Sequence, residues 1–329
     1  MPALRKVGED IAFAGIGYAR PEEWFDDMSM VPANVVSEQQ DRERAKAQTF
    51  IDMYGGSLYC GYRQLIESED VDAVYLPLPP ALHCKWAKVA LDNGKHVFLE
   101  KPSTASLADT ESLVKLASAK ELALCENYMF LFHNQIRALD EVVRSGEIGD
   151  IRLYRISFGF PMRTENDFRY NKALGGGALL DAGGYPLRYA DYLLGSSARI
   201  VTAQANKIKG FEVEMFGSCT MVNDSGVTAQ LAFGMDNDYK CEVEIWGSKG
   251  TITSGRIFTA PDGFVPSYTV KKNQVIESRQ LPADDAFRKS IERFVLSVKD
   301  NKVRNENYGL LQRQEYLVEC FKRLSGMGL

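Results

Sequence analysis

Three stretches of this chain combine proton-transferring side chains with turn residues that would place them at a cleft. The first is Val97–Pro102 (VFLEKP), in which an apolar strand-like run ends in an acid, a base and a proline. Ligands of open α/β sheets bind outside the carboxyl ends of the strands, so Lys101 is expected to face a cleft. Its ammonium could hydrogen-bond a carbonyl or hydroxyl oxygen that gains and loses a proton. The alternative is a solvated Glu100–Lys101 ion pair at an ordinary strand end.

The second stretch is 175–186 (GGGALLDAGGYP), where three glycines precede a helix. Asp181 and Tyr185 are four residues apart, which places both on one face of that helix. A phenol with a pKa of about 10 can donate a proton to a developing alkoxide if a nearby lysine stabilises its anion. Considered alone, the stretch is better explained as a loop followed by an ordinary buried helix with a satisfied tyrosine hydroxyl.

The third stretch is 75–83 (YLPLPPALH), which also follows a strand-like run. Its prolines would make a rigid loop that could lie against a flat ring. His83 could contact a ligand there, or it could equally cap the helix that follows. The residues alone leave both interpretations open.

The first 126 residues alternate between strand-like and helix-like stretches, and this alternation must position the first and third stretches. Short apolar runs predict strands, and apolar residues at helical spacing predict helices. The expected strands are 10–18, 71–76, 96–99 and 122–125, and the expected helices are 42–54, 81–93 and one that opens at Ser106. Such alternation is typical of an α/β fold with a parallel, doubly wound sheet covered on both faces.

The rest of the chain is rich in β-strand patterns and ends in helices. Several of its segments alternate polar with apolar residues, which predicts an open-faced antiparallel sheet with one solvated or partner-facing side. The expected strands are 151–160, 199–208, 212–222, 226–235, 239–247 and 268–280, and the expected helices are 135–145, 284–299 and 306–324. We therefore expect an α/β domain over 1–126 and an α+β domain over 127–329.

The composition excludes several classes of protein. With 39 basic against 44 acidic residues, the chain has a formal net charge of −5 and lacks the basic stripe that binding to nucleic acid needs. No run of about 18 apolar residues is present, so no membrane span is expected. The first residues lack the apolar core of a signal peptide. The six scattered cysteines and three histidines show no metal-ligand spacing, so we expect reduced thiols, no metal and a cytoplasmic location.

Together with three further runs, these stretches resemble the glucose–fructose oxidoreductase/inositol dehydrogenase/MocA (Gfo/Idh/MocA) family. The further runs are 126–133 (ENYMFLFH), 227–235 (VTAQLAFGM) and 244–248 (EIWGS). The resemblance covers nearly the whole chain and is strongest to the sugar-nucleotide 3-ketoreductases of deoxysugar pathways. It implies an N-terminal Rossmann domain, an open-faced C-terminal sheet and NAD(P)-dependent hydride transfer to a sugar carbon.

The resemblance also implies roles for individual residues. Lys101 matches the lysine of the family's Glu-Lys-Pro motif, which hydrogen-bonds the reacting oxygen. Tyr185 stands where many members have a histidine and where the 3-ketoreductases have a tyrosine proposed as the general acid. Asp181 would orient the substrate or the Tyr–Lys pair. Contacts with the cofactor are expected from Arg20, Leu78, Pro79, His83, Glu100, Lys101 and Asn127.

The implied function is an NADP-dependent oxidoreductase that reduces a keto group on a nucleotide-linked deoxysugar, with NAD as the alternative cofactor. Two other functions stay open. One is a dehydrogenase of free sugars such as xylose, or of trans-dihydrodiols, and the other is a cofactor-poor relative that acts as an assembly or regulatory subunit. The expected partner is a sugar or sugar-nucleotide substrate, without nucleic acid or membrane. The C-terminal sheet is expected to mediate a homo-oligomer.

The N-terminus departs from the family pattern. Residues 1–7 (MPALRKV) resemble the end of the helix that follows the family's glycine-rich turn, and 10–18 resembles the second strand. Arg20 then stands where NADP-preferring relatives often carry Ser-Arg. On this interpretation the first strand and the pyrophosphate turn are missing, the Rossmann domain is truncated, and 21–40 is an insertion. Weak or absent cofactor binding would follow.

A rival interpretation takes 15–20 (GIGYAR) as the glycine fingerprint itself, with Glu38 as the acid that binds the ribose. It has two weaknesses. Arg20 stands where a small residue should pack, and 34–40 is too polar for a buried central strand. We therefore favour truncation over this rival.

Overall fold

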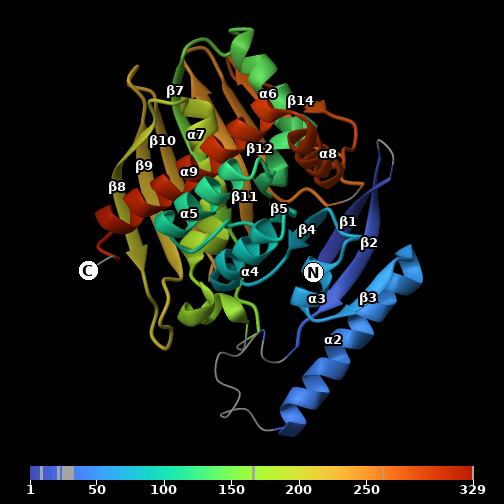
Figure 1. Cartoon of the computed structure of the whole chain (residues 1–329). Helices are drawn as coiled ribbons and strands as arrows, with labels where there is room; N and C mark the ends of the chain where they lie inside the picture. Colours follow the sequence, from blue (N-terminus) through green and yellow to red (C-terminus); the bar gives the residue numbers. More distant parts are fainter. Residues whose placement is uncertain (8–9, 21–22, 24–32, 165–166, 262, 328–329) are drawn as a thin grey trace. The chain divides into compact units, whose positions relative to one another are not determined.

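The computed structural model describes residues 1–7, 10–20, 23, 33–164, 167–261 and 263–327, which form two compact units (Figure 1). The first unit consists of 1–103, 108–126 and 294–309, and the second of the other described residues. Two C-terminal helices are therefore shared between the units, α8 (Ala286–Lys299) and α9 (Asn301–Leu324). The end of α8 and the beginning of α9 belong to the first unit. The chain passes from the first unit to the second after residue 126, where the domain boundary was expected. The expectation did not include 294–309 in the first unit.

The first unit is built on a six-stranded sheet in the order β3-β2-β1-β4-β5-β6. Neighbouring strands are parallel in the pairs β2–β3, β4–β5 and β5–β6. This order is that of a dinucleotide-binding Rossmann sheet, which confirms the fold class expected for the N-terminal part. The strands are β1 (Pro2–Val7), β2 (Asp10–Tyr18), β3 (Ser57–Cys60), β4 (Ala73–Leu76), β5 (His96–Leu99) and β6 (Leu124–Glu126).

Strand β1 corrects the expectation for the N-terminus. Residues 1–7 were expected as the end of a helix, and the central strand position was expected to be empty. Instead, β1 fills that position and runs antiparallel to both neighbours, with Ala3 opposite Gly15 of β2 and Val74 of β4. An unfilled position would leave the backbone groups of β2 and β4 unpaired, and a strand of either direction can satisfy them. The sheet is therefore mixed rather than purely parallel.

The rival glycine fingerprint is wrong. Gly15 and Gly17 lie inside β2, not in a turn between a strand and a helix. A Cβ added at Gly15 would lie 2.2 Å from the carbonyl oxygen of Ser57, so this glycine allows β2 to pack closely against β3. Glu38 lies within helix α2 (Ala33–Tyr54), not at a strand end. Of the expected insertion 21–40, Glu23 and 33–40 are described, and the rest lies outside the described residues.

Helices link the strands of the first unit. After α2 come α3 (Tyr62–Glu67), α4 (Pro80–Asp92) and α5 (Leu107–Ala119). Helices α4 and α5 lie where the sequence predicts them, α2 begins earlier than the expected 42–54, and α3 was not expected. On α4, Trp86 and Ala90 are buried, and the helix ends before Gly94, whose φ of +74° favours glycine. The return of the chain through α8 adds Phe294, whose ring stacks on Phe98 of β5 with centroids 5.1 Å apart.

The second unit is built on an eight-stranded sheet in the order β14-β13-β12-β11-β7-β10-β9-β8. Among the described strands of this second sheet, only the pair β10–β7 is parallel, so the expectation of an antiparallel sheet holds with one exception. The strands are β7 (Ile151–Gly159), β8 (Arg199–Asn206), β9 (Phe216–Val222), β10 (Thr228–Gly234), β11 (Lys240–Gly247), β12 (Thr251–Gly255), β13 (Ser267–Lys272) and β14 (Val275–Gln280). The expected strand 268–280 is thus a hairpin of two strands, because Asn273 and Gln274 both adopt positive φ and turn the chain. Strand β12 was not foreseen.

One face of this sheet is covered by helices and the other is open, as the alternation along β11 shows. Val243 and Ile245 are buried, whereas Glu242 and Trp246 point away from the core. The covering helices are α6 (Asn134–Arg144), α7 (Gly184–Leu194) and the later part of α9 (Figure 1). Among the described helices, none is both long and apolar enough to cross a membrane.

Candidate active site

Lys101 lies just beyond the end of β5, at the carboxyl edge of the parallel strands, as the sequence predicts. Glu100, which precedes it, accepts a hydrogen bond from the hydroxyl of Tyr75 on the neighbouring strand β4. The second carboxylate oxygen of Glu100 accepts from the backbone N–H of Lys101 at 3.3 Å. The Glu100 carboxylate therefore fastens the strand end that carries Lys101 to β4.

The turn after Lys101 is held from two further sides. The carbonyl of Pro102, whose peptide bond with Lys101 is cis, lies 2.8 Å from Nδ1 of His83. A carbonyl can only accept, so Nδ1 carries the proton, and burial of His83 lowers its pKa and keeps the ring neutral. On the far side, the backbone N–H of Ser103 donates to Glu126 at the end of β6 at 2.7 Å. The turn is therefore rigid without any contribution from a ligand.

The loop before α4 is also well ordered by packing. Leu78 and Pro79 are buried, and Pro79 is the residue from which α4 begins. His83 lies within α4, so it does not cap that helix, and its fully buried side chain supports the Lys101 turn. Contacts of these three residues with a cofactor stay predictions.

Asp181 and Tyr185 lie on one continuous helical segment of the second unit. This segment starts as a π-helix, η5 (Leu179–Gly183), and continues as α7. Its start is fixed by Glu214, whose carboxylate accepts from the backbone N–H of Leu179 at 2.9 Å. Gly177 makes this approach possible, because its φ is +122° and an added Cβ would lie 2.4 Å from the Glu214 carboxylate. Turns of π-helix are rare and often occur at functional sites.

The carboxylate of Asp181 is bound to an arginine that the sequence analysis did not single out. Arg169 donates from Nε to Asp181 at 2.7 Å and from Nη1 to Asp167 at 3.0 Å. All three side chains are largely buried, so these ion pairs are less screened than surface pairs. The guanidinium also lies 4.6 Å from the centre of the Phe168 ring. Asp181 is therefore oriented by Arg169.

The ring of Tyr185 is surrounded by other aromatic rings and is only 6% exposed. Its centroid lies 5.0 Å from that of Phe158 and 5.4 Å from that of Tyr128, both edge to face. A Cβ at Gly184 would lie 2.1 Å from the hydroxyl of Tyr128, so only glycine allows α7 to approach this ring. Packing of this kind fixes the ring plane and thereby the direction of the Tyr185 hydroxyl.

Asn127 is the remaining predicted contact in the second unit. Its side chain is 3% exposed, and its Oδ1 accepts a hydrogen bond from the hydroxyl of Ser290 at 2.8 Å. This bond ties the residue after β6 to helix α8. A contact of Asn127 with a cofactor stays a prediction.

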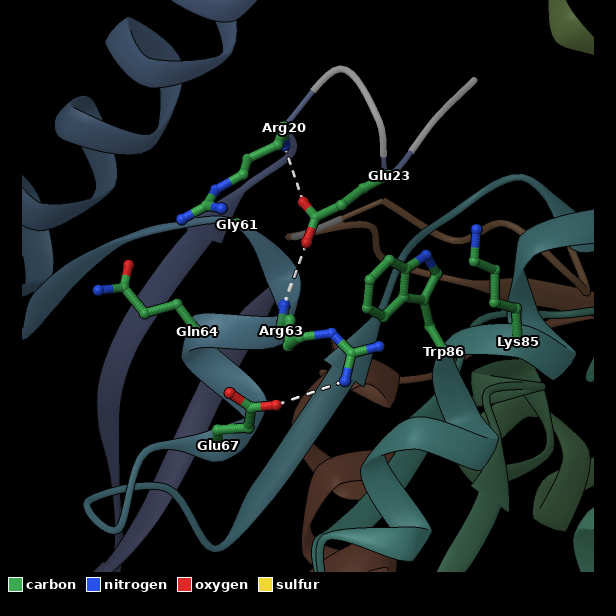
Figure 2. A pocket seen from close by; sticks show the side chains of 8 residues that line it. All are labelled: Arg20, Glu23, Gly61, Arg63, Gln64, Glu67, Lys85 and Trp86. Atoms are coloured by element: carbon green, nitrogen blue, oxygen red, sulfur yellow. Dashed lines mark hydrogen bonds and ion pairs between the residues drawn. The ribbon is translucent and has the colours of Figure 1, made fainter. Parts of the chain in front are cut away.

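Arg20 lies where β2 ends, beside an open pocket of about 470 Å³ in the first unit (Figure 2). Its Nε donates to the carbonyl of Cys60 at 2.9 Å. Two further cations border the pocket: Arg63, which pairs with Glu67 at 3.4 Å, and Lys85. Trp86 also lines the pocket, although its side chain is only 2% exposed. The pocket thus offers positive charge, which suits a phosphate-bearing ligand.

The structure divides the predicted site residues between the two units, and each set is ordered within its own unit. Leu78, Pro79, His83, Glu100, Lys101 and Arg20 belong to the first, and Asn127, Asp181 and Tyr185 belong to the second. Two residues that hold the second set, Arg169 and Glu214, were not predicted from the sequence. An arginine between two aromatic residues in 168–170 was the available signal for Arg169, whereas no local pattern marks Glu214.

Two family models match most of the chain. The model described as "Oxidoreductase family, NAD-binding Rossmann fold" matches 10–128, and that of the GFO/IDH/MocA C-terminal domain matches 136–253. The chain belongs to the GFO/IDH/MocA oxidoreductase family. The family expected from the motifs is therefore confirmed.

The relatives of this family member include named sugar reductases. The chain is 38% identical over 258 residues to the dTDP-3,4-didehydro-2,6-dideoxy-alpha-D-glucose 3-reductase of Saccharopolyspora spinosa, covering 78% of each chain. It is 41% identical over 272 residues to the enzyme of that name from Streptomyces violaceoruber, covering 82% of this chain and 78% of the relative. It is 28% identical to D-xylose 1-dehydrogenase (NADP(+)) 2 of Haloferax volcanii, covering 82% of this chain and 85% of that one.

A solved structure is similar over most of the chain. KijD10, a 3-ketoreductase from Actinomadura kijaniata in complex with NADP and TDP-benzene, aligns with a TM-score of 0.82 and 38% identity. The alignment covers 86% of this chain and 87% of KijD10. Structures of KijD10 also include variants in which a tyrosine is replaced by phenylalanine or a lysine by alanine.

Proposed function

We propose that this oxidoreductase uses NADPH to reduce the C3 keto group of a dTDP-linked deoxysugar. The observation that carries the proposal is the likeness to KijD10, which extends over 86% of the chain with a TM-score of 0.82. The two dTDP-sugar 3-reductases, at 38% and 41% identity, support the same substrate class. The xylose dehydrogenase is more distant, at 28% identity, and makes oxidation of a free sugar the second candidate.

The pocket beside Arg20 fits one end of NADP. A phosphate monoester on the adenosine ribose would find the guanidinium of Arg20 at the end of β2, with Arg63 and Lys85 across the pocket. The pyrophosphate end is different, because Rossmann sheets bind it at a glycine turn that opens into a helix. In the described part of the first unit, the central position holds the antiparallel strand β1 instead. We therefore assign residues only to the adenosine end of the cofactor, namely Arg20, Arg63 and Lys85, and none to its pyrophosphate.

The proposed chemistry assigns one task to each ordered side chain. When bound, the nicotinamide supplies the hydride that reduces the carbonyl carbon. Tyr185 donates its phenolic proton to the carbonyl oxygen, which becomes the product hydroxyl, and regains a proton from solvent. Lys101 hydrogen-bonds the same oxygen and stabilises the negative charge that develops on it. Arg169 and Asp181 fix the helix turn from which Tyr185 acts.

Turnover with two substrates tests this function. Mixed with NADPH and a dTDP-linked 3-keto-deoxysugar, the full chain should consume NADPH about 100-fold faster than it reduces NADP⁺ with D-xylose, because a site for a sugar nucleotide gains contacts with the nucleotide that xylose cannot make. Activity with xylose alone would favour the second candidate. No turnover together with no detectable NADPH binding would favour a cofactor-poor assembly or regulatory subunit.

We also propose that the chain forms a homo-oligomer through the open face of its C-terminal sheet. Trp246 on β11 and Phe216 on β9 are 49% and 41% exposed on this face. The Arg155–Glu244 pair, at 2.7 Å, lies among them and supplies polar groups that a second copy can match. Sedimentation of the chain at micromolar concentration should show a dimer or larger species that Trp246→Glu dissociates, and a monomer in both cases would contradict the proposal.

A further inference from the structure

Glu23 links two chain segments at the mouth of the Arg20 pocket. Its side chain is buried, at 7% exposure, and its oxygens accept three backbone N–H groups. Figure 2 shows the bonds from Arg20 and Arg63. Oε2 accepts from Arg20 at 2.7 Å and from Tyr62 at 3.0 Å, and Oε1 accepts from Arg63 at 3.1 Å. A buried carboxylate is costly unless its lone pairs are satisfied, and here they are. Glu23 thus connects the exit of β2 to the turn between β3 and α3.

The same turn fixes the side chain of Arg20. The guanidinium donates from Nε to Cys60 O at 2.9 Å, one residue before Gly61. Gly61 has a φ of +108°, and an added Cβ would lie 3.0 Å from Arg20 Nε and 3.2 Å from Glu23 Oε1. The positive φ favours glycine here, and the absence of a Cβ lets both side chains approach this turn closely. The backbone and the guanidinium of Arg20 are therefore held by one small group of contacts.

Glu23 could change the affinity of the pocket for an anion in two opposite ways, through its charge or through its effect on the position of Arg20. By charge alone, a carboxylate near Arg20, Arg63 and Lys85 weakens the binding of a phosphate. By position, it strengthens binding, because a guanidinium already held in place loses less conformational entropy when it binds. Since the Glu23 carboxylate accepts three backbone N–H groups, including that of Arg20 itself, it holds the segment that carries the guanidinium, and the positional effect should be the larger one.

We propose that Glu23 is a positioning residue that holds Arg20 for the 2′-phosphate of the cofactor and so sets the preference for NADP over NAD. This inference rests on the proposed use of NADPH. It adds a specificity-determining contact that does not itself touch the ligand. Gly61 is part of the same arrangement, since it supplies the space that Glu23 and Arg20 share.

Binding of nucleotide fragments to the full chain tests the inference without turnover. Titration calorimetry with 2′,5′-ADP and with 5′-AMP compares the presence and absence of the 2′-phosphate and needs no pyrophosphate site. The wild type should prefer 2′,5′-ADP. Glu23→Gln should weaken 2′,5′-ADP binding about tenfold, the effect of a lost charged hydrogen bond, and change 5′-AMP binding less than twofold.

The controls separate position from charge and from folding. Glu69→Gln makes the same charge change on an exposed turn residue of the first unit and should leave both affinities unchanged. Glu23→Ala should behave as Glu23→Gln does, and retained 5′-AMP binding shows that either variant is folded. Tighter binding of 2′,5′-ADP by Glu23→Gln, or no change in its affinity, would overturn the inference. Neither result would contradict the proposed NADPH-dependent reduction. A wild type with no preference for 2′,5′-ADP would overturn it together with the proposed NADP site.

Discussion

Tyr185→Phe should lower the turnover number of the proposed reduction by a factor on the order of 10² to 10⁴, the usual contribution of a positioned general acid. The substitution removes the proton donor and keeps the ring, so the packing against Phe158 and Tyr128 is retained. We expect the KM for the sugar nucleotide to change little and the melting temperature to stay close to that of the wild type. Steady-state kinetics and a thermal melt on the same preparations measure these quantities.

Tyr189→Phe is a matched control for this experiment, because Tyr189 lies one turn further along the same helix α7. Its side chain is completely buried, and its hydroxyl has no hydrogen-bond partner among the described residues. Removing that hydroxyl should leave turnover unchanged. If Tyr185→Phe kept more than half of the wild-type turnover, the proton donor would have to be another group.

Acid should destabilise the first unit through His96, the first residue of β5. Its Nδ1 accepts the backbone N–H of Ala123 at 2.9 Å, which requires the neutral ring. Burial, together with the charge of Arg304 and against that of Asp72, lowers the pKa of His96 to about 4. In the unfolded chain this pKa is about 6.5. As the pH falls from 6.5 to 4, the unfolded chain takes up a proton that the folded chain refuses, so stability falls by on the order of 2 to 3 kcal/mol.

Urea unfolding of the wild type and of His96→Asn, followed from pH 7.5 to pH 4.5, measures this effect. The asparagine amide can still accept the N–H of Ala123 but has no proton to gain. The free energy of unfolding of the variant should therefore fall less steeply below pH 6.5, and the stability difference at pH 7.5 corrects for any loss of packing. A difference between the two proteins that stays constant over this range would show that His96 titrates normally in the folded state.

The sequence predicted most of the elements because their hydrophobic patterns are local. The strand 96–99 and the helix 81–93 were found within a few residues, since apolar spacing and Gly94 mark them without reference to the rest of the chain. Strand β1 could not be predicted in this way. Its residues have no strong strand pattern, and it is a strand because the edges of β2 and β4 need a partner.

The residues of the candidate site could be predicted only where they belong to a local sequence motif. Lys101 and Tyr185 stand in motifs, and the structure places each on an ordered element. Glu23 and Glu214 could not be found, because their roles depend on contacts 39 and 35 residues away in the sequence. No run of neighbouring residues records such a contact. Sequence motifs therefore indicated the reacting groups, and the structure was needed to find the residues that orient them.

The return of the chain to the first unit has a consequence for its synthesis on the ribosome. The ring of Phe294 and the later residues up to 309 belong to this unit, so the buried cluster around Phe98 and Phe294 cannot close when the last strand of the sheet, β6, has just been made. At ordinary rates of translation the wait lasts roughly ten to forty seconds. During that time the nascent sheet exposes Phe98 without its stacking partner, which makes it a ready substrate for chaperones. The nucleotide-binding unit, although first in the sequence, is therefore completed almost last.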